Sequence, residues 1–147
     1  MEISIDEATE SDLPFVLDLY REVLDFSKPI LTIDEAQSIF EKISQYPDYH
    51  LYIVKFGKEI VGSFALLIMD NLAHLGTPSA IVEDVVVAEN YQNKGIGKLM
   101  MQYAMKNARV KGCYKMVLSS NLKRKDAHRF YESLGFEKHG LSFVVEL

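Results

Sequence analysis

The sequence predicts an α/β domain whose sheet is flanked by about four helices. Runs that are β-branched or that alternate between apolar and polar residues are typical of strands, and between them apolar residues recur at helical spacing. A length of 147 residues and a hydrophobic content of 48% fit one domain with a real core, residues 1–147. The predicted strands are residues 2–7, 51–56, 60–69, 81–87, 115–119 and 141–147.

The first two predicted helices begin at capping boxes, in which a Thr is followed three residues later by an acid. Thr9 precedes Asp12, and Thr32 precedes Glu35. A break at residues 26–29 separates the two helices. We expect the side chains of the first helix to line a substrate pocket without taking part in catalysis.

A predicted hairpin precedes the central strand. Strands 51–56 and 60–69 are joined by a Gly-Lys turn, and residues 70–79 then form a loop. Loops held by a rigid sheet often carry recognition groups. His74 is therefore a secondary candidate for substrate binding or for a general base, although a lone loop histidine is more often without a function.

The formal net charge of −5 hides a strong asymmetry. Residues 91–129 hold ten of the 16 Lys and Arg residues and one acid, so this stretch carries +9 while the rest carries −14. A focused positive potential suits a polyanion. The acidic remainder argues against the long footprint of a duplex nucleic acid. A compact phosphorylated cofactor fits better, and several of these lysines would simply be solvated.

Three further features bound the function. The single cysteine, Cys113, excludes an internal disulfide and agrees with a reducing, cytoplasmic location. The longest apolar-rich run, residues 60–69, is too short to span a bilayer, and the start of the chain shows no signal peptide pattern. The four histidines lack metal-ligand spacing. We expect no metal, no membrane partner and no nucleic acid partner, and we expect Cys113 to be structural.

The most informative stretch, residues 83–99, predicts a strand, a polar turn and the start of a helix. A helix that begins near Gly95 presents free backbone N–H groups to the turn, and such a terminus attracts anions. Two known glycine motifs do not fit. The dinucleotide fingerprint needs a glycine where Met100 stands, and the P-loop needs Ser or Thr after Lys98.

The remaining pattern, Gln92-x-x-Gly95-x-Gly97 after a central strand, resembles the signature of the GNAT superfamily of acetyl-coenzyme A-dependent N-acetyltransferases. The resemblance implies a mixed, mostly antiparallel sheet of six or seven strands whose central strands splay apart. The pantetheine arm would enter that gap and bind the open strand edge like an added strand. The cofactor-binding residues that it implies are Val85, Val86, Val87, Gln92, Asn93, Lys94, Gly95, Ile96, Gly97, Lys98, Asn121 and Tyr131.

Residues 121–136 resemble the second signature of the family, Asn…Ala-x-x-Phe-Tyr-x-x-x-Gly-Phe. This run is similar to bacterial acetyltransferases that act on aminoalkylphosphonates or aminoglycosides. Residues 82–87, together with the run Gly-Cys-Tyr-Lys at residues 112–115, resemble glucosamine-6-phosphate N-acetyltransferase instead. Neither match settles the acceptor. We expect Gly135 to end the fourth helix as its C-cap.

The predicted chemistry is direct acetyl transfer to an amine that must first lose a proton. Glu83 is the favoured base, because strict alternation places it on the same face as Val85, opposite Val86. Asp84 is the alternative if a bulge breaks the alternation. The resemblance further implies that the amide of Val85, or alternatively that of Val86, polarises the acetyl carbonyl and that Tyr131 protonates the leaving thiolate.

Two classes of function stay open at this stage: an active N-acetyltransferase, and an acetyl-coenzyme A-binding sensor or scaffold without turnover. Glu83 and Tyr131 favour the enzyme. The acceptor is expected to be a small primary amine that also carries an anionic group, because the basic cluster of Lys123, Arg124, Lys125 and Arg129 exceeds what the cofactor pyrophosphate alone needs. A polycationic acceptor would prefer the acids elsewhere in the chain. Homodimerisation is left open.

Overall fold

The computed structural model describes residues 2–24 and 29–147. The chain forms two compact units, Met1–Val117 and Leu118–Leu147, which are described in turn. The break predicted at residues 26–29 lies largely outside the described residues. No helix in the described ranges is long and apolar enough to cross a membrane.

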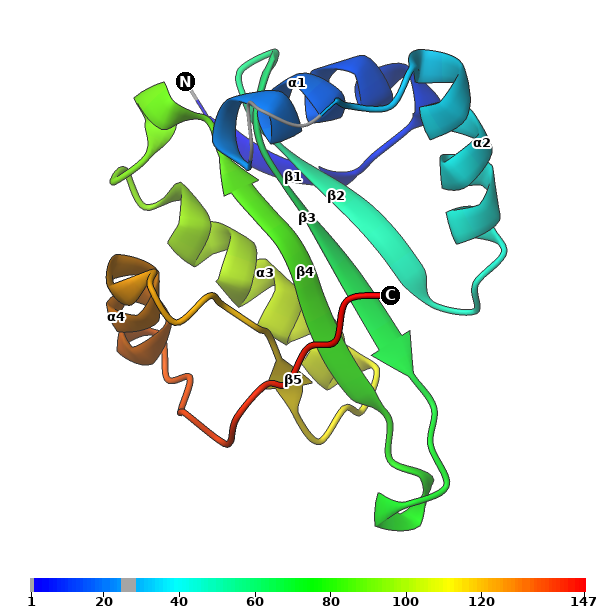
Figure 1. Cartoon of the computed structure of the whole chain (residues 1–147), viewed down its shortest axis with the longest axis vertical. Helices are drawn as coiled ribbons and strands as arrows, with labels where there is room; N and C mark the ends of the chain where they lie inside the picture. The colour runs from blue at the N-terminus through cyan, green and yellow to red at the C-terminus, as the bar shows by residue number, and fades with distance from the viewer. Residues whose placement is uncertain (1, 25–28) are drawn as a thin grey trace. The chain divides into compact units, whose positions relative to one another are not determined.

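The N-terminal unit is built on one five-stranded sheet with the strand order β1-β2-β3-β4-β5 (Figure 1). Pairing is antiparallel from β1 to β4, and β5 lies parallel to β4, so the sheet is mixed and mostly antiparallel as predicted. The strands are β1 (Ile3–Glu7), β2 (Tyr49–Phe56), β3 (Glu59–Met69), β4 (Ser79–Val87) and β5 (Met116–Val117).

The prediction of six or seven strands was wrong, because the sheet has five. The segment 141–147, predicted to be a strand, has no regular secondary structure. An alternating pattern forms a strand only where another strand accepts its backbone hydrogen bonds. Residues 118–147 contain no described strand that could do so, and Phe143 and Val144 stay exposed.

The N-terminal unit contains three α-helices in its described residues: α1 (Leu13–Val23), α2 (Ile33–Ser44) and α3 (Ile96–Val110). Both capping boxes are present. The Thr32 hydroxyl accepts a hydrogen bond from the Glu35 amide at 3.2 Å, which starts α2 directly. The box at Thr9 starts a single 3₁₀ turn, and α1 follows it.

The face of the sheet that packs on α3 is aromatic. Tyr52 of β2 pairs with Phe64 of β3, and their rings stack at 5.1 Å. Tyr103 of α3 lies edge-on to both rings, with centroids 5.3 and 6.4 Å away. Phe64 is fully buried, so this contact anchors α3 beneath the centre of the sheet.

The opposite face packs on α1. Ile53 of β2 pairs with Ser63 of β3, and Ile53 belongs to a buried cluster with Val16 of α1. Because side chains alternate along a strand, Ser63, Ala65 and Leu67 all point toward this face. We call it the α1 face; it carries the side chains discussed below.

The C-terminal unit contains one helix, α4 (Lys125–Ser133), in its described residues. Gly135 follows it with φ +94°, and the Phe136 amide donates to the Tyr131 carbonyl at 3.1 Å. A glycine in this left-handed conformation is a common way to end a helix. The helix thus ends at the predicted glycine, although its C-cap is Leu134 and Gly135 lies one residue further on. With α4 the expected four helices are present.

Candidate active site

β4 contains a bulge at its two carboxylates. Asp84 and Val85 together oppose the single residue Phe64 of β3. Asp84 takes a left-handed conformation with φ +53°, which a short polar side chain tolerates better than most others do. This is the bulge on which the alternative role of Asp84 depended.

The bulge reverses the side-chain alternation of β4. Before it, Glu83 pairs with Ala65 on the α1 face, and after it Val86 pairs with Ser63 on the same face. The predicted alternation, which grouped Glu83 with Val85 and placed Val86 opposite, was therefore wrong beyond Glu83. One extra residue in a strand moves every later side chain to the other face.

The negative charge of the β4 carboxylates acts on two tyrosines, Tyr20 and Tyr49. Burial raises the pKa of the Tyr20 phenol, and the negative charge of Asp84 raises it further. Burial also raises the pKa of Tyr49, with further contributions from Asp84 and Glu83. The two carboxylates, Tyr20 of α1 and Tyr49 of β2 thus form one cluster.

The sequence analysis located this cluster only in part. Tyr20 belongs to the first helix, whose side chains were expected to line the substrate pocket. Tyr49 was missed, because the strand was predicted to begin at residue 51. The alternation of β2 actually extends two residues further back, and it would have placed Tyr49 on the same face as Leu51.

Glu83 and Asp84 are both exposed. Within residues 2–24 and 29–147, no Lys, Arg or His side chain forms an ion pair with either of them. A carboxylate in this position can take a proton from an amine directly or through one water. Both carboxylates are therefore candidates for a general base.

The turn between β4 and α3 presents a row of backbone donors. Gly95 has φ +83° and forms the N-cap of α3. In the described chain, the N–H groups of residues 93–98 have no backbone or side-chain acceptor, whereas the Leu99 amide already donates to the Gly95 carbonyl at 3.2 Å. Such a row, together with the positive end of the helix dipole, binds anions.

Three side chains fasten this turn to the sheet. The Gln92 side-chain amide donates to the Val87 carbonyl at 3.0 Å, and the Tyr91 hydroxyl donates to Glu59 at 2.7 Å. The Lys94 ammonium lies 5.4 Å from the centre of the Tyr91 ring. Gln92 therefore holds the end of β4 beside the donors at residues 93–98, and these predicted residues are brought together.

β4 also keeps an open edge. It pairs with β5 only at Ala80–Met116 and Ile81–Val117, so the edge of residues 82–87 away from β3 has no partner strand within the N-terminal unit. The splaying of the central strands stays a prediction, because β5 has only two residues. The backbone groups of Val85 and Val87 lie along the part of β4 that runs beyond β5.

Two predicted site residues belong to the C-terminal unit. Tyr131 lies on α4 between Phe130 and Phe136, with ring centroids 5.2 and 5.7 Å away. Burial raises the pKa of its phenol, while the charge of Arg124 acts in the opposite direction. The Asn121 side-chain oxygen accepts from the Lys123 amide at 2.9 Å, so Asn121 shapes the turn before α4.

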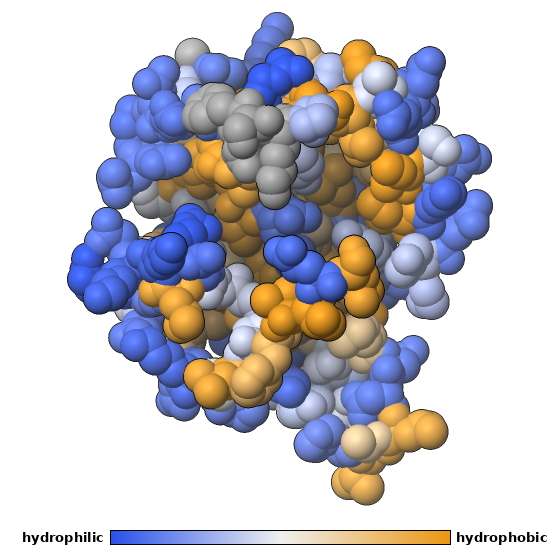
Figure 2. Space-filling view, in the orientation of Figure 1, coloured by the Kyte–Doolittle hydropathy of each residue, from blue (hydrophilic) through white to orange (hydrophobic). Residues whose placement is uncertain are grey.

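His74 lies in the loop between β3 and β4, which Figure 1 shows projecting beyond the ends of the strands. Its ring packs on Tyr114 at 4.6 Å. Figure 2 shows apolar surface at the tip of this loop, where Leu72 and Leu75 are fully exposed. Nothing in this arrangement connects His74 with Glu83, and its role as a base has no structural support.

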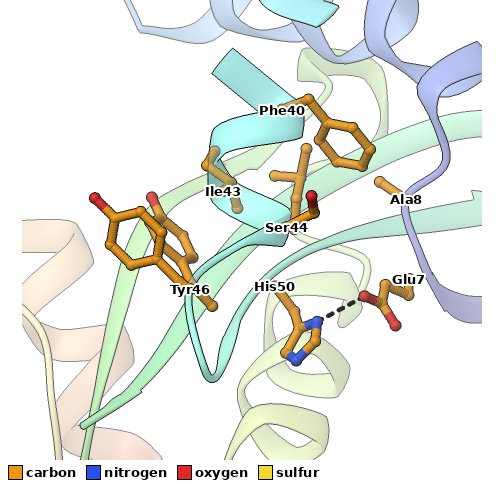
Figure 3. Close-up of a pocket in the computed structure, with 9 residues that line it drawn as sticks. Glu7, Ala8, Phe40, Ile43, Ser44, Tyr46 and His50 are labelled. Carbon is orange, nitrogen blue, oxygen red and sulfur yellow. Dashed lines mark hydrogen bonds and ion pairs between the residues drawn. The ribbon is translucent and has the colours of Figure 1, made fainter. Parts of the chain in front are cut away.

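A small pocket opens between α2 and the ends of β1 and β2 (Figure 3). Phe40, Ile43 and Leu51 give it an apolar wall, and Tyr49 also lines it. Tyr46 stands at one side. At its other end Nδ1 of His50 lies 2.6 Å from Glu7. Tyr49 belongs to both this pocket and the cluster around the β4 carboxylates.

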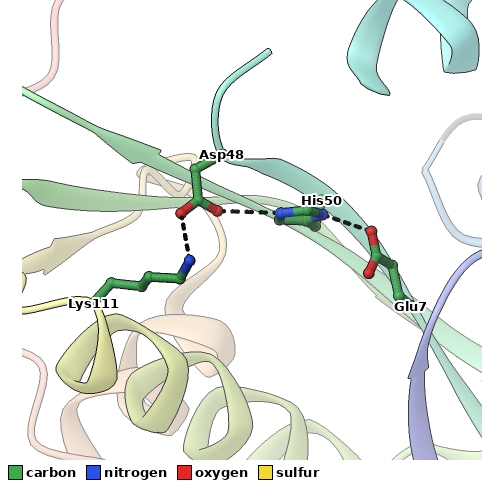
Figure 4. Close-up of polar contacts among 4 residues, drawn as sticks. All are labelled: Glu7, Asp48, His50 and Lys111. Atoms are coloured by element: carbon green, nitrogen blue, oxygen red, sulfur yellow. Dashed lines mark hydrogen bonds and ion pairs between the residues drawn. The ribbon is translucent and has the colours of Figure 1, made fainter. Parts of the chain in front are cut away.

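A chain of charged groups braces this end of the sheet (Figure 4). Lys111, at the end of α3, lies 3.3 Å from Asp48, and the other oxygen of Asp48 lies 3.2 Å from Nε2 of His50. The chain continues from His50 to Glu7 of β1. It connects β1, β2 and α3, and we assign it a structural role.

Neither Cys113 nor a group of metal-ligating side chains adds to the candidate site in the described residues. Burial and the charge of Asp48 raise the pKa of the Cys113 thiol, which disfavours the nucleophilic thiolate at neutral pH. Among the described residues, no group of three His, Cys, Asp or Glu side chains is placed to hold a metal ion.

Comparison with known proteins shows the family to which the chain belongs. Residues 13–136 match the model of the acetyltransferase (GNAT) family. Over 88 residues the chain is 40% identical to glucosamine 6-phosphate N-acetyltransferase of Trypanosoma brucei brucei, covering 60% of this chain and 58% of that protein. Over 101 residues it is 31% identical to aminoalkylphosphonate N-acetyltransferase of Salmonella typhimurium, covering 69% and 65%. The matched regions thus span about three fifths of these curated relatives.

A solved structure extends the likeness to the whole fold. A protein of Agrobacterium tumefaciens str. C58 that is assigned as an acetyltransferase superposes with a TM-score of 0.92 at 32% identity, covering 98% of this chain and 99% of that one. The sequence match and the likeness of the fold thus point to the same kind of protein. The chain belongs to the acetyltransferase (GNAT) family.

Proposed function

We propose that this protein transfers the acetyl group of acetyl-coenzyme A directly to a primary amine of a small molecule. The observation that carries the proposal is the row of free N–H groups at residues 93–98, immediately after a strand that bears two exposed carboxylates. An anion-binding turn and a general base beside one open strand edge are the parts that acetyl transfer from a phosphorylated thioester needs.

Acetyl-coenzyme A fits the residues present. The pyrophosphate would be held by the amides of Asn93 through Lys98, with Gln92 fixing the turn. The amide-rich pantetheine arm would bind along the open edge of β4 at Val85, Val86 and Val87. Asn121 and Tyr131 of the C-terminal unit complete the proposed binding set. The names of the relatives, all N-acetyltransferases, support this cofactor.

The reaction balances with three proton transfers. Glu83, or Asp84 in its place, takes a proton from the acceptor ammonium, and the free amine nitrogen forms a bond to the acetyl carbon. The Val85 amide donates to the carbonyl oxygen as negative charge develops there. The carbon–sulfur bond then breaks, and Tyr131 gives its proton to the departing thiolate. The nitrogen, which became positively charged when it bonded to carbon, gives its second proton to the Tyr131 phenolate and so becomes the neutral amide nitrogen.

Two alternatives differ from this proposal. A sensor module would bind acetyl-coenzyme A without turnover, and it would have no need of a carboxylate on β4. The names of two relatives suggest glucosamine 6-phosphate and aminoalkylphosphonates as acceptors. We keep glucosamine 6-phosphate as the alternative acceptor. A cytoplasmic location and a homodimer stay predictions.

Substitution of Glu83 tests the proposal. Thiol release from acetyl-coenzyme A is measured with a panel of primary amines, and Glu83→Gln should lower kcat by about 10²–10⁴-fold if Glu83 is the base. Cofactor affinity, measured by calorimetry, should hardly change. Asp6→Asn, on β1, is the matched control with an equal loss of charge. A protein that binds acetyl-coenzyme A but releases no thiol with any amine would contradict the proposed transfer.

A further inference from the structure

We propose that the acceptor carries a second positive charge, and that Asp84 and the aromatic pair Tyr46–Tyr49 bind it. The acceptor class is then a diamine or a linear oligoamine. This inference rests on the proposed function, because it concerns the second substrate of that transfer. It differs from the sequence-based expectation of an acceptor with an anionic group.

β4 carries two adjacent carboxylates, one more than the deprotonation of an amine requires. Deprotonating one ammonium needs one base, yet the bulge leaves both Glu83 and Asp84 exposed near Tyr49, without a cationic partner among the described residues. When one carboxylate accepts the proton it becomes neutral, and the other keeps its charge. An acceptor with a second ammonium would compensate that remaining charge throughout the reaction.

The second step is the aromatic pair. Tyr46 and Tyr49 lie edge-to-face, with ring centroids 5.4 Å apart and an interplanar angle of 84°. Tyr49 pairs with Leu67, which points toward the α1 face, so Tyr49 shares the face of Glu83. Tyr46 is 54% exposed and offers an accessible ring. Aromatic faces beside carboxylates are a recurring way to bind organic cations.

The third step is the charge of the surrounding surface. No Lys or Arg contributes to the pocket that Tyr46 and Tyr49 border, and its charged end is formed by Glu7 with His50 (Figure 3). The charged groups that raise the pKa of Tyr49 are both carboxylates. The basic cluster that suggested an anionic acceptor, residues 123–129, belongs to the C-terminal unit. In the N-terminal unit a phosphate on this face would meet like charges.

The spacing of the sheet sets the length of the acceptor. Adjacent strands lie about 4.8 Å apart, so the distance from β4 to β2 across the α1 face is about 10 Å. Long side chains on both strands shorten the gap. A four-carbon diamine or a longer oligoamine can place one nitrogen at Glu83 and another near Tyr49.

The test compares amines that are matched in shape but differ by one charge. The wild-type protein is assayed by thiol release with 1,4-diaminobutane, spermidine, n-butylamine, 2-aminoethylphosphonate and glucosamine 6-phosphate under one condition. We expect kcat/KM for 1,4-diaminobutane to exceed that for n-butylamine at least tenfold. In Asp84→Asn and in Tyr49→Leu this ratio should fall toward one.

The ratio of kcat/KM for 1,4-diaminobutane to that for n-butylamine distinguishes a binding role of Asp84 from a role as the base. A residue that acts only as the base would lower both rates equally and leave the ratio unchanged, which would overturn the proposal for Asp84. Asp6→Asn is the control and should keep the wild-type ratio. Turnover of the phosphorylated amines without turnover of the diamines would overturn the inference while leaving acetyl transfer intact. Absence of turnover with all five amines would count against the proposed function itself.

Discussion

The phenol of Tyr131 is the single side chain on which the proposed departure of the thiolate depends. It is packed between two phenylalanines on and after α4, and burial raises its pKa above the ordinary value of 10.0. A phenol with a raised pKa stays protonated through the neutral range. It is therefore in the right state to give its proton to a thiolate.

Tyr131→Phe removes that proton while keeping the ring. We expect kcat to fall by about 10²-fold, within the range of general acid catalysis, and KM for acetyl-coenzyme A to change little. In the wild-type protein the alkaline limb of kcat/KM should begin above pH 10, because deprotonated Tyr131 cannot serve as the acid. The pH profile is measured by thiol release from pH 6 to 10.5. Identical profiles for both proteins would remove Tyr131 from the mechanism.

At the scale of elements, the bulge in β4 requires a left-handed backbone conformation at Asp84. Asp84 holds φ +53°, which costs most residues about 1–2 kcal/mol and costs glycine little. Its side chain is exposed, so packing does not compensate for this strain. A residue kept in such a conformation points to a role for its side chain.

Two substitutions at Asp84 should show how much its left-handed backbone conformation costs in stability. Asp84→Gly is expected to be as stable as the wild-type protein, whereas Asp84→Val should lower the free energy of unfolding by about 1–2 kcal/mol, since a β-branched residue resists positive φ. Urea denaturation followed by circular dichroism measures both. Equal stability of the two variants would mean that position 84 is not held in the left-handed conformation in solution.

The first turn of α3 gives a second prediction at this scale. Acetyl-coenzyme A should raise the melting temperature by mass action, and Gly97→Asp should abolish the shift, because a carboxylate would repel the pyrophosphate at the amides of residues 93–98. Gly140→Asp is the matched control, since nothing lies within 4 Å of that glycine. Calorimetric titration showing the same affinity for wild-type and Gly97→Asp protein would rule out the pyrophosphate site.

Local sequence signals predicted where helices begin. The capping boxes at Thr9 and Thr32 located two helix starts, and Gly95 located a third. The phase of β4 beyond Glu83 could not be predicted from alternation, because a bulge is decided by pairing with β3. Segment 141–147 has the alternation of a strand but lacks a partner in its own unit.

For the whole molecule, buried phenols set the upper limit of the stable pH range. Burial raises the pKa of Tyr20 above 10.0 and that of Tyr52 to about 12. The folded state thus keeps these phenols protonated where the unfolded chain already loses the protons. Stability is fully present below pH 10 and is lost as the pH rises above that value.

Removing the phenol of Tyr20 should weaken the dependence of stability on pH above pH 10. Above pH 10 the free energy of unfolding of Tyr20→Phe is expected to fall less steeply than that of the wild-type protein, by up to about 1.4 kcal/mol per pH unit. Tyr114→Phe, at a tyrosine that is 43% exposed, is the control. Urea titrations at intervals between pH 8 and 11.5 provide the slopes. A Tyr20→Phe slope equal to that of the wild-type protein would refute the prediction.

The phase change in β4 also bears on how this chain can be recombined with its relatives. Even-numbered side chains point away from the α1 face before Asp84 and toward it afterwards, as Val82 and Val86 show through their partners on β3. Consider a chimera that takes the first half of β4 from one parent and the second half from another. Its apolar side chains keep their faces only if the junction retains the extra residue of the bulge. Crossovers that delete it would turn Val86 toward the α3 face and shift the donor-rich turn with it, so functional hybrids should cluster on junctions outside residues 83–86.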